Sequence, residues 1–475
     1  MLGERDPRAG RSLMNGNDIT ALGFSGKAIG LALGAARERA REGVTNQDVL
    51  TELAHVQHHP ESFTDDPAYA ALARELLGQQ ARVPDTLRDR PLAYRQWGED
   101  LIEEGARAQM DTAMRLPVSV AGALMPDAHF GYGLPIGGVL ATDNAVIPYG
   151  VGVDIGCSMR LSVLPIEGLS RDEEARLLRR NTRFGAGGSW ERKVRPDHDV
   201  LDEDTWDEFP LLRQLRDKAA EQIGTSGSGN HFVEFGTFTL EQPDLGLEPG
   251  EYVALLSHSG SRGFGAQVAG HYTRVAQNLH PRLDPDARKL AWLDMGHEEG
   301  EAYWAAMELA GRYALANHEV IHDRISKALK VTPLVTVSNS HNLAWKQTLG
   351  DGREVIVHRK GATPAAQGQL GIIPGSMADP GFVVRGLGNA DALESASHGA
   401  GRQMGRKQAE RQLDRAAVTK YLEERGVTLL GGGIDEAPMA YKRIEEVIAR
   451  QQDLVEVVAK FTPRVVKMDT GKEDI

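Results

Sequence analysis

The chain has 475 residues, more than the roughly 100 to 200 of a typical domain, so we expect two domains or one large core with an appendage. A hydrophobic content of 41% with 25% charged residues is ordinary for a globular protein, and no run of about 18 apolar residues could cross a bilayer. The formal net charge of −13 argues against broad non-specific nucleic-acid binding, although a local groove of Arg and Lys can coexist with an acidic remainder.

Cysteine usage and the start of the chain indicate the compartment. One cysteine in 475 residues excludes an internal disulfide framework, which favours a reducing environment. The segment from Met1 to Asp6 has no apolar stretch of the kind found in a secretory signal. We therefore expect a cytoplasmic protein without membrane segments.

Residues 1–88 are expected to form a small helical N-terminal appendage. Helical patterns cover residues 29–41, 49–56 and 69–77. The stretch from Met14 to Gly30 resembles a helical segment in the RNA-binding part of tRNA nucleotidyltransferases, so either RNA contact or simple amphipathic packing remains open for this appendage. Residues 82–91 are rich in Pro, Arg and Asp, which is typical of a linker.

The main domain is expected to span residues 89–475 with a mixed α+β fold. A helix is predicted over residues 99–114, followed by short apolar runs with the character of buried strands. These runs cover residues 137–142, 159–165, 232–238, 252–257, 334–337 and 354–357. Between and after them, helical patterns cover residues 211–222, 266–277, 298–329, 402–411 and 441–451. With 53 glycines, many at strand ends, we expect the backbone to approach a ligand at several places.

Five candidate metal ligands stand at strand ends or in Gly-rich turns. Alone, each is more often a structural residue, but Gly or Ser neighbours let the backbone approach a ligand at every one of them. A site of mixed Asp, Cys and His ligands suggests zinc by ligand preference, with manganese, cobalt or iron as alternatives. The five residues are Asp154, Cys157, His231, His258 and His341.

A second group of residues suits phosphate and nucleotide binding. Arginine offers forked donors to phosphoryl oxygens, and Gly-rich turns such as Pro374–Met377 supply backbone N–H groups. The alternative for such cations is a solvated face or a salt bridge. The basic residues of this group are Arg262, Arg359, Lys360, Arg402, Arg406 and Lys467.

A series of ordered motifs resembles the RtcB family of RNA ligases. The similarity extends from about residue 91 to residue 467, and its specificity comes from the number of motifs that recur in the same order. They are Met125–Gly133, Gly152–Cys157, Gly229–Glu234, His258–Gly265, His358–Ala362, Pro374–Met377, His398–Arg402 and Asp435–Pro438. The resemblance implies a catalytic core of packed sheets with surrounding helices.

The resemblance also implies an activity and its cofactors. It implies a ligase that joins an RNA 3′-phosphate or 2′,3′-cyclic phosphate end to a 5′-hydroxyl end, in RNA repair or tRNA splicing, with GTP as cosubstrate. Two Mn2+ ions are implied, with Cys157 bridging them, Asp154 and His231 on one ion, and His258 and His341 on the other. Some relatives also depend on an archease-type activating partner. Neither this dependence nor the identity of the cellular RNA can be read from the sequence.

Catalytic and nucleotide-binding roles follow from the same resemblance. His398 is expected to attack the α-phosphate of GTP, for which its imidazole must be unprotonated, a state that neutral pH permits. Asp127 matches a carboxylate near the metals, and Arg262, Arg402 and Arg406 are expected to hold phosphates or the geometry of the site. The implied contacts to GMP are Asn230, Phe232, Glu234, Asn342, Pro374, Gly375, Ser376, Met377, Gly401 and Lys467.

Two departures from the family pattern bear on substrate choice. Ser158 stands where a glycine usually follows the cysteine, and the segment from Ala378 to Phe382 differs from the usual small residues before an aromatic, which puts a nucleotide contact at Gly381 in doubt. The chain also extends past Lys467 to Ile475, where many relatives end.

Two other functions are weighed against the ligase. His318-Glu319-x-x-His322 on a predicted helix matches the pattern of zinc metalloproteases, in which two histidines one turn apart hold zinc and the glutamate acts as general base. No compelling third ligand follows at a familiar spacing, and short patterns arise by chance. The remaining alternative is an inactive relative that binds guanine nucleotide or RNA ends.

Overall fold

A computed structural model describes residues 14–24, 26–81 and 83–470. The chain divides into two compact units, Met1–Pro84 and Asp85–Ile475, so the division falls slightly before the boundary predicted after residue 88. Residues 1–13, on which the prediction of no secretory signal rests, lie outside the described residues, as do the last five residues of the C-terminal extension. No helix in the described ranges combines the length and apolar character needed to span a membrane.

The N-terminal unit is a small bundle of helices with its own apolar core. Side-chain caps fix two of its helix starts: Asn15 forms a capping box with Asp18, and Thr45 accepts a hydrogen bond from the Asp48 N–H. The core gathers Ile19, Phe24, Leu53 and other buried residues. The three predicted helices are present with longer bounds; the unit contains α1 (Gly16–Ala21), α2 (Lys27–Arg41), α3 (Asn46–His58) and α4 (Ala70–Ala81).

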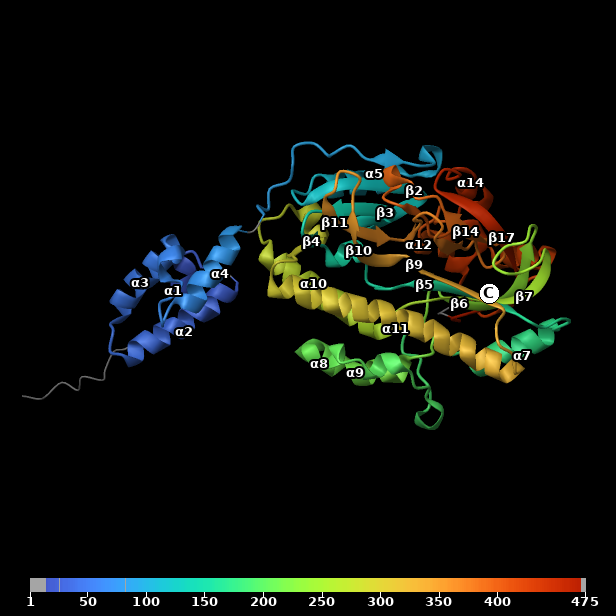
Figure 1. The fold of residues 1–475 in the computed structure, drawn as a ribbon, viewed down its shortest axis with the longest axis horizontal. Coiled ribbons are helices and arrows are strands. Elements are labelled where there is room, and N and C mark those ends of the chain that lie inside the picture. The colour runs from blue at the N-terminus through green and yellow to red at the C-terminus, as the bar shows by residue number, and fades with distance from the viewer. Residues whose placement is uncertain (1–13, 25, 82, 471–475) are drawn as a thin grey trace, which may run out of the picture. The chain divides into compact units, whose positions relative to one another are not determined.

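Two large sheets form the C-terminal unit, Asp85–Ile475 (Figure 1). The first has the order β1 (Arg95–Gln96), β2 (Ser119–Tyr132), β3 (Leu134–Thr142), β11 (Glu354–Lys360), β10 (Asn342–Thr348). The second has the order β13 (Leu370–Ile373), β14 (Gly381–Gly386), β17 (Val455–Met468), β6 (Phe232–Leu240), β7 (Gly250–Ser259), β5 (Ser158–Leu164), β9 (Val335–Ser340), with β16 (Thr428–Leu430) paired to β17. Two short pairs join β4 (Ala145–Val146) to β8 (Leu293–Asp294) and β12 (Ala362–Pro364) to β15 (Ser395–Ser397).

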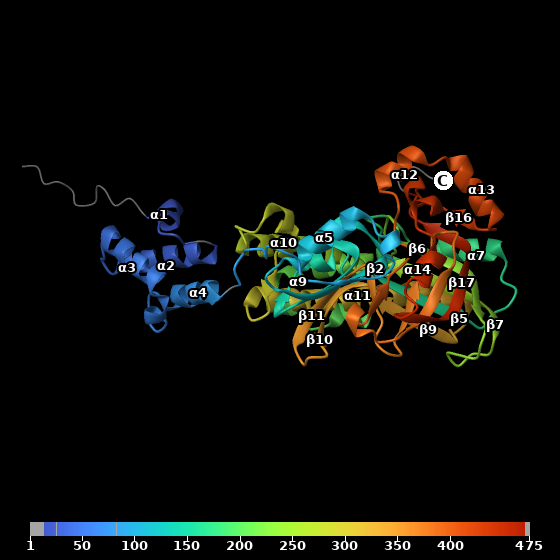
Figure 2. The same cartoon turned by 90° about the horizontal axis from the view of Figure 1, so that it is seen from above.

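Helices surround these sheets. The ribbon shows α11 running lengthwise along the second sheet, with α8 and α9 beyond it (Figure 1), and α12 and α13 gathered with β16 at one end of the unit (Figure 2). The helices are α5 (Glu104–Met114), α6 (Pro148–Val151), α7 (Arg171–Asn181), α8 (Thr205–Glu208), α9 (Pro210–Gln222), α10 (Arg262–Leu279), α11 (Glu298–Leu329), α12 (Arg406–Gln412), α13 (Arg415–Glu424) and α14 (Ile444–Ala449). The fold is therefore the mixed α+β core of packed sheets that the sequence predicts.

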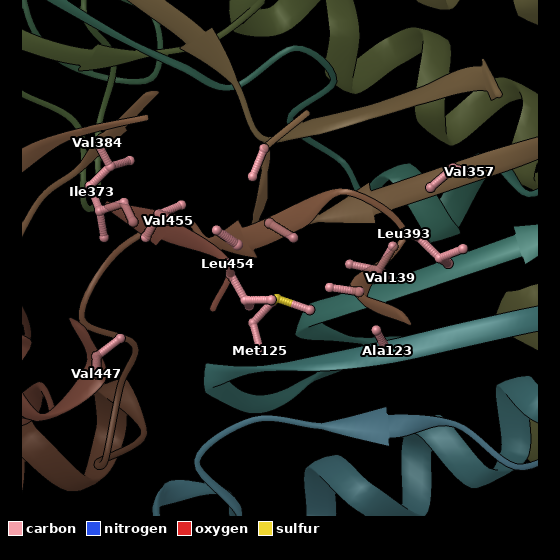
Figure 3. Packing of buried hydrophobic residues seen from close by; sticks show 14 of the residues in the cluster. Ala123, Met125, Val139, Val357, Ile373, Val384, Leu393, Val447, Leu454 and Val455 are labelled. Carbon is pink, nitrogen blue, oxygen red and sulfur yellow. The ribbon is translucent and has the colours of Figure 1, made fainter. Parts of the chain in front are cut away.

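A shared apolar core joins the first sheet to the edge of the second (Figure 3). Met125 and Val139 from the first sheet pack in one buried cluster with Ile373, Val384 and Val455 from the second. Burial of such side chains stabilises the fold by about 1.5 to 3 kcal/mol each. The cluster fixes β2 relative to β14 and β17, which carry or flank the cavity described below.

Three predicted helices begin or break differently in the structure. The helix predicted over residues 402–411 begins only at Arg406, because Arg402 turns away to form a bridge with Tyr441. The helix predicted over residues 441–451 is limited to α14, and the one over residues 99–114 divides into a 3-10 turn, Glu99–Leu101, and α5. In each case a tertiary contact or a turn replaces helical hydrogen bonds that the local pattern alone favours.

Candidate active site

The five candidate metal ligands converge because of the register of the second sheet. Asp154 and Cys157 lie in the turn between α6 and β5, and His231 directly precedes β6. On β7, His258 pairs with Met159 of β5 and Phe232 of β6, so all three segments meet at one end of the sheet. His341 follows β9, whose last residue pairs with the first residue of β5.

The ligand atoms form two overlapping sets that share the cysteine. One set is Asp154, Cys157 and His231; the other is Cys157, His258 and His341; within each set the atoms lie within 4.8 Å of one another. Cys157 Sγ lies 3.1 Å from His258 Nε2 and 3.5 Å from His231 Nε2. His231 Nε2 lies 2.9 Å from Asp154 Oδ2, and the Nε2 atoms of His258 and His341 are 3.3 Å apart.

Hydrogen bonds on the outer side of the cluster direct lone pairs inward. The Nδ1 of His231 donates to the Ser226 carbonyl at 2.6 Å, and the Nδ1 of His258 donates to the Asn230 carbonyl at 3.1 Å. With a cation bound, both imidazoles would be neutral and keep their one ring hydrogen on Nδ1, so both Nε2 atoms would direct lone pairs toward the cation. Electron-rich atoms this close repel one another unless a cation lies among them, so the donor set fits a divalent transition metal.

The pKa directions of these groups follow from burial. Desolvation lowers the pKa of His258 and His341 well below the ordinary value, and burial together with the Asp154 carboxylate raises the pKa of the Cys157 thiol. Burial opposes ionisation of Asp154 as well, but the His231 hydrogen bond and nearby positive charge hold the pKa of that carboxyl below its usual range. A bound cation would favour the thiolate, because metal coordination deprotonates a thiol.

A glycine contact positions the Asp154–Cys157 turn. Gly156 has φ +72°, and an added Cβ would lie 2.8 Å from the Gly311 Cα atom of α11. The turn therefore packs directly on the helix backbone, which a side chain at Gly156 would prevent. Ser158, the residue that departs from the family pattern, donates to the Gly156 carbonyl at 2.5 Å and lies 2.8 Å from the Ser340 hydroxyl, so it ties this turn to β9.

His398 lies beside this cluster and is held by a buried carboxylate. Its Nδ1 donates to Asp127 Oδ2 at 2.7 Å, and the backbone N–H groups of His398 and Gly399 donate to the same oxygen at 3.1 and 3.4 Å. The His398 ring centroid is 5.0 Å from that of His341. Because Nδ1 carries the hydrogen, the lone pair resides on Nε2, which is the state a nucleophilic imidazole needs.

Asp127 is suited to this role by its environment. The side chain is fully buried in β2, and burial alone would raise its pKa, but the hydrogen bond from His398 and the nearby Lys442 ammonium hold that pKa below its usual range. Lys442 in turn donates to the Pro126 and Ala128 carbonyls on either side of Asp127. The carboxylate stays ionised and fixes the orientation of the histidine ring.

A cavity of about 1000 Å³ opens over His398. The predicted nucleotide contacts that line it are Asn230, Phe232, Glu234, Pro374, Gly375, Ser376, Met377 and Gly401. Burial raises the pKa of Glu234 well above its ordinary value. Gly401 has φ +73°, and an added Cβ would lie 2.1 Å from the Asp127 carbonyl oxygen, so glycine is required where the chain passes Asp127. The volume is ample for a nucleotide.

Two predicted nucleotide contacts do not line this cavity. Asn342 accepts a hydrogen bond from the Gly361 N–H at 2.7 Å and donates to the Asp154 carbonyl at 3.2 Å, so it holds the metal-ligand turn. The Lys467 ammonium lies 3.1 Å from the Thr182 hydroxyl and donates to two carbonyls at the end of α7. At Gly381, an added Cβ would lie 3.2 Å from the Pro374 Cα atom, so this residue packs closely against the Pro374–Met377 turn.

The three predicted arginines differ in their surroundings. Arg402 and Arg406 line the cavity, and both form salt bridges with the buried Glu436 carboxylate. The distance from Arg402 Nη1 to Glu436 Oε2 is 3.1 Å. Arg262 is buried, donates to the Thr225 hydroxyl and the Gly185 carbonyl, and does not line the cavity. Arg402 and Arg406 thus bring positive charge to the cavity wall, whereas Arg262 is held by Thr225 and Gly185 away from the cavity lining.

Several residues of the site could not be singled out from the sequence. Glu436 lies in the Asp435–Pro438 motif, which helps to indicate the family but by itself predicts no role for this residue. Nothing in the sequence around Lys442 indicates a role for it, because its partners in β2 lie more than 300 residues earlier in the chain. Phe130 and Tyr132 line the cavity with side chains that are 59% and 62% exposed, and only the fold reveals that exposure.

The contacts of His318 and His322 exclude the metalloprotease. His318 bonds the Ser257 hydroxyl and the Ser259 carbonyl, and both ring nitrogens of His322 bond serine hydroxyls, so neither has a free lone pair for zinc. Glu319 points elsewhere and pairs with Arg160 at 3.3 Å. The buried histidines anchor α11 to the second sheet.

Comparison with known proteins decides the family. A family model described as tRNA-splicing ligase RtcB matches residues 109–184 and 202–469. The chain belongs to the RtcB family. The RNA-splicing ligase RtcB1 of Escherichia coli is 34% identical over 389 residues, covering 75% of this chain and 92% of the relative. The RNA-splicing ligase RtcB of Mycobacterium tuberculosis is 34% identical over 416 residues, covering 72% and 95% of the two chains. The tRNA-splicing ligase RtcB of Thermococcus kodakarensis is 29% identical over 418 residues, covering 72% and 86%.

Proposed function

We propose that this protein joins RNA 3′-phosphate or 2′,3′-cyclic phosphate ends to 5′-hydroxyl ends, with GTP as cosubstrate and two Mn2+ ions as cofactors. As a member of the RtcB family it is an enzyme, an RNA ligase of tRNA splicing or RNA repair. The observation that carries the finer proposal is the His398 ring, whose Nδ1 is bonded to Asp127 at 2.7 Å, at the cavity and beside the paired ligand sets.

In the first step, His398 Nε2 attacks the α-phosphorus of GTP. An N–P bond forms, the bond from the α-phosphorus to the bridging oxygen breaks, and pyrophosphate leaves. The ring then carries a positive charge, which the buried Asp127 carboxylate compensates through the Nδ1 hydrogen bond. Two Mn2+ ions held by Asp154, Cys157, His231, His258 and His341 would supply charge that neutralises the phosphoryl oxygens.

The remaining steps transfer GMP and seal the strand. An oxygen of the RNA 3′-phosphate attacks the phosphorus bonded to His398, and the ring recovers its Nε2 lone pair as the N–P bond breaks. The RNA 5′-hydroxyl then attacks the activated 3′-phosphorus, GMP leaves, and the hydroxyl proton passes to water. A cyclic phosphate end is first opened by water. Arg402 and Arg406, at the cavity wall, are placed to hold phosphoryl oxygens during these displacements.

We further propose the partners of the protein and its location in the cell. RNA carrying these ends is the partner, and an archease-type activator is a second one. A cytoplasmic location is expected from the single cysteine. We also propose that the N-terminal helical unit contacts RNA.

Incubation with α-labelled GTP and Mn2+, followed by a denaturing gel, tests the first step. We expect a covalent, acid-labile label on the wild type and none on His398→Ala. Absence of label on a wild type that binds Mn2+ would contradict the proposal and favour an inactive relative that only binds nucleotide or RNA ends. A matched control is His271→Ala, because His271 lies on α10 and does not line the cavity.

A further inference from the structure

A strongly basic segment runs from the second half of α7 into the loop that follows this helix. Residues 176–195 contain seven basic side chains and one acidic one, in a chain whose net charge is −13. We call this stretch the basic segment; its cations are Arg176, Arg179, Arg180, Arg183, Arg192, Lys193 and Arg195. Such a reversal of the overall charge makes a local patch that attracts anions.

Most of these cations have no acidic partner. Arg195 lies 3.5 Å from Glu221, but Arg179, Arg180, Arg192 and Lys193 are exposed and form no salt bridge within the described part of the chain. Exposed like charges held together repel one another, which costs free energy until an anion neutralises them.

Aromatic stacking and burial hold the segment in place. The guanidinium groups of Arg183 and Arg324 lie 4.3 and 3.7 Å from the centroid of the buried Trp190 ring. The Trp190 indole N–H donates to the Gly224 carbonyl at 3.0 Å. The positive charge of the segment is therefore carried on a fixed surface.

The basic segment is bonded directly to the chain that carries a metal ligand. The Ser226 N–H donates to the Arg183 carbonyl at 2.8 Å, and the Ser226 carbonyl accepts the His231 Nδ1 hydrogen at 2.6 Å. The Gly185 N–H donates to the Gly227 carbonyl at 2.6 Å. The basic segment and the chain that carries His231 are therefore direct neighbours in the fold, so an anion bound on the segment lies near the ligand cluster.

We infer that the basic segment binds the sugar-phosphate backbone of the RNA substrate and guides its end to the catalytic centre. Arginine forks match phosphate oxygens, and RNA presents a row of phosphates at a spacing that several cations can contact at once. The family model leaves out residues 185–201, so Arg192, Lys193 and Arg195 lie in a part of the chain that the common core does not supply. This inference rests on the proposed RNA ligase function and adds to it a surface for substrate binding.

The test is a fourfold variant, with Arg179, Arg180, Arg192 and Lys193 each changed to Gln. We expect the rate of GTP labelling to stay at the wild-type value, because none of these residues lines the cavity. The KM for RNA should rise about tenfold or more, and the slope of log KM against log salt should fall by as much as about 3, since each phosphate contact on a single strand contributes about 0.7.

A control variant removes the same charge from elsewhere on the surface. It changes four exposed cations that each have a carboxylate partner to Gln: Arg95, Arg353, Lys420 and Arg443. We expect its KM for RNA and its salt slope to match the wild type. The inference is overturned if the fourfold variant leaves KM and the salt slope unchanged, which is also the result expected if the surface serves another anionic partner. It is likewise overturned if both variants raise KM equally. Failure of the proposed function is distinct, because the wild type itself would then neither label nor ligate.

Discussion

Replacing Asp127 by asparagine tests how the proposed nucleophile is prepared. The substitution keeps the size of the side chain but removes its negative charge, which accepts the Nδ1 hydrogen of His398 at 2.7 Å. The fully buried position leaves no water to replace that charge. Without it, the ring is no longer held with its lone pair on Nε2, and the positive charge that forms on attack is not compensated.

The magnitude follows from the strength of one charge-assisted hydrogen bond. Such a bond contributes about 1.5 to 3 kcal/mol, which corresponds to a rate reduction of about tenfold to 150-fold. The assay is single-turnover labelling with α-labelled GTP at saturating nucleotide. We expect the labelling rate to fall by this factor while the affinity for GTP changes little, because Asp127 itself does not line the cavity.

Two controls separate chemistry from folding. A thermal melt of Asp127→Asn establishes that the variant is folded, and Asp391→Asn, at an exposed carboxylate paired with Arg95, should label at the wild-type rate. A folded Asp127→Asn enzyme that labels within twofold of the wild type would refute the assigned role of the carboxylate.

Three further predictions concern metal, backbone and buried charge. Mn2+ should raise the melting temperature of the wild type but not of Cys157→Ala, because this residue belongs to both ligand sets; an equal shift in the two proteins would contradict the assigned ligands. Gly401→Ala should abolish labelling, since its Cβ would meet the Asp127 carbonyl, whereas Gly405→Ala, with nothing within 4 Å, should label normally. Burial raises the pKa of Glu174 to about 7 from 4.5, so the ionised form costs stability that grows as pH rises through this range. Glu174→Gln should therefore melt a few degrees higher than the wild type at pH 8 and equally at pH 4.5, by calorimetry, a gain of up to about 3 kcal/mol; a difference independent of pH would count against it.

Local patterns predicted the long helices better than the strands, although three helices begin late, are shortened or are divided in the structure. The predicted helix over residues 298–329 has the observed bounds of α11, because its apolar positions repeat continuously over many turns. The long strands β2 and β17 gave no such signal: both contain bulges, and β17 includes Pro463 next to one of them. A bulge shifts the alternation of side chains by one residue, so the period of two that identifies a strand is lost.

The sequence by itself determined the family, because its motifs recur in the order of the RtcB RNA ligases; the metal ligands, the nucleophilic histidine and the guanine nucleotide are predictions from that resemblance. Only the tertiary structure decided which side chains meet. Asp127 and His398 are 271 positions apart in the chain, and β2 and β15 bring them into contact. Asn342 and Lys467 carry the same motif signals as their neighbours, yet they hold a turn and a helix end and do not line the cavity. The physical reason is that a motif specifies donor and acceptor atoms, whereas strand register and packing direct those atoms toward a ligand or toward the protein itself.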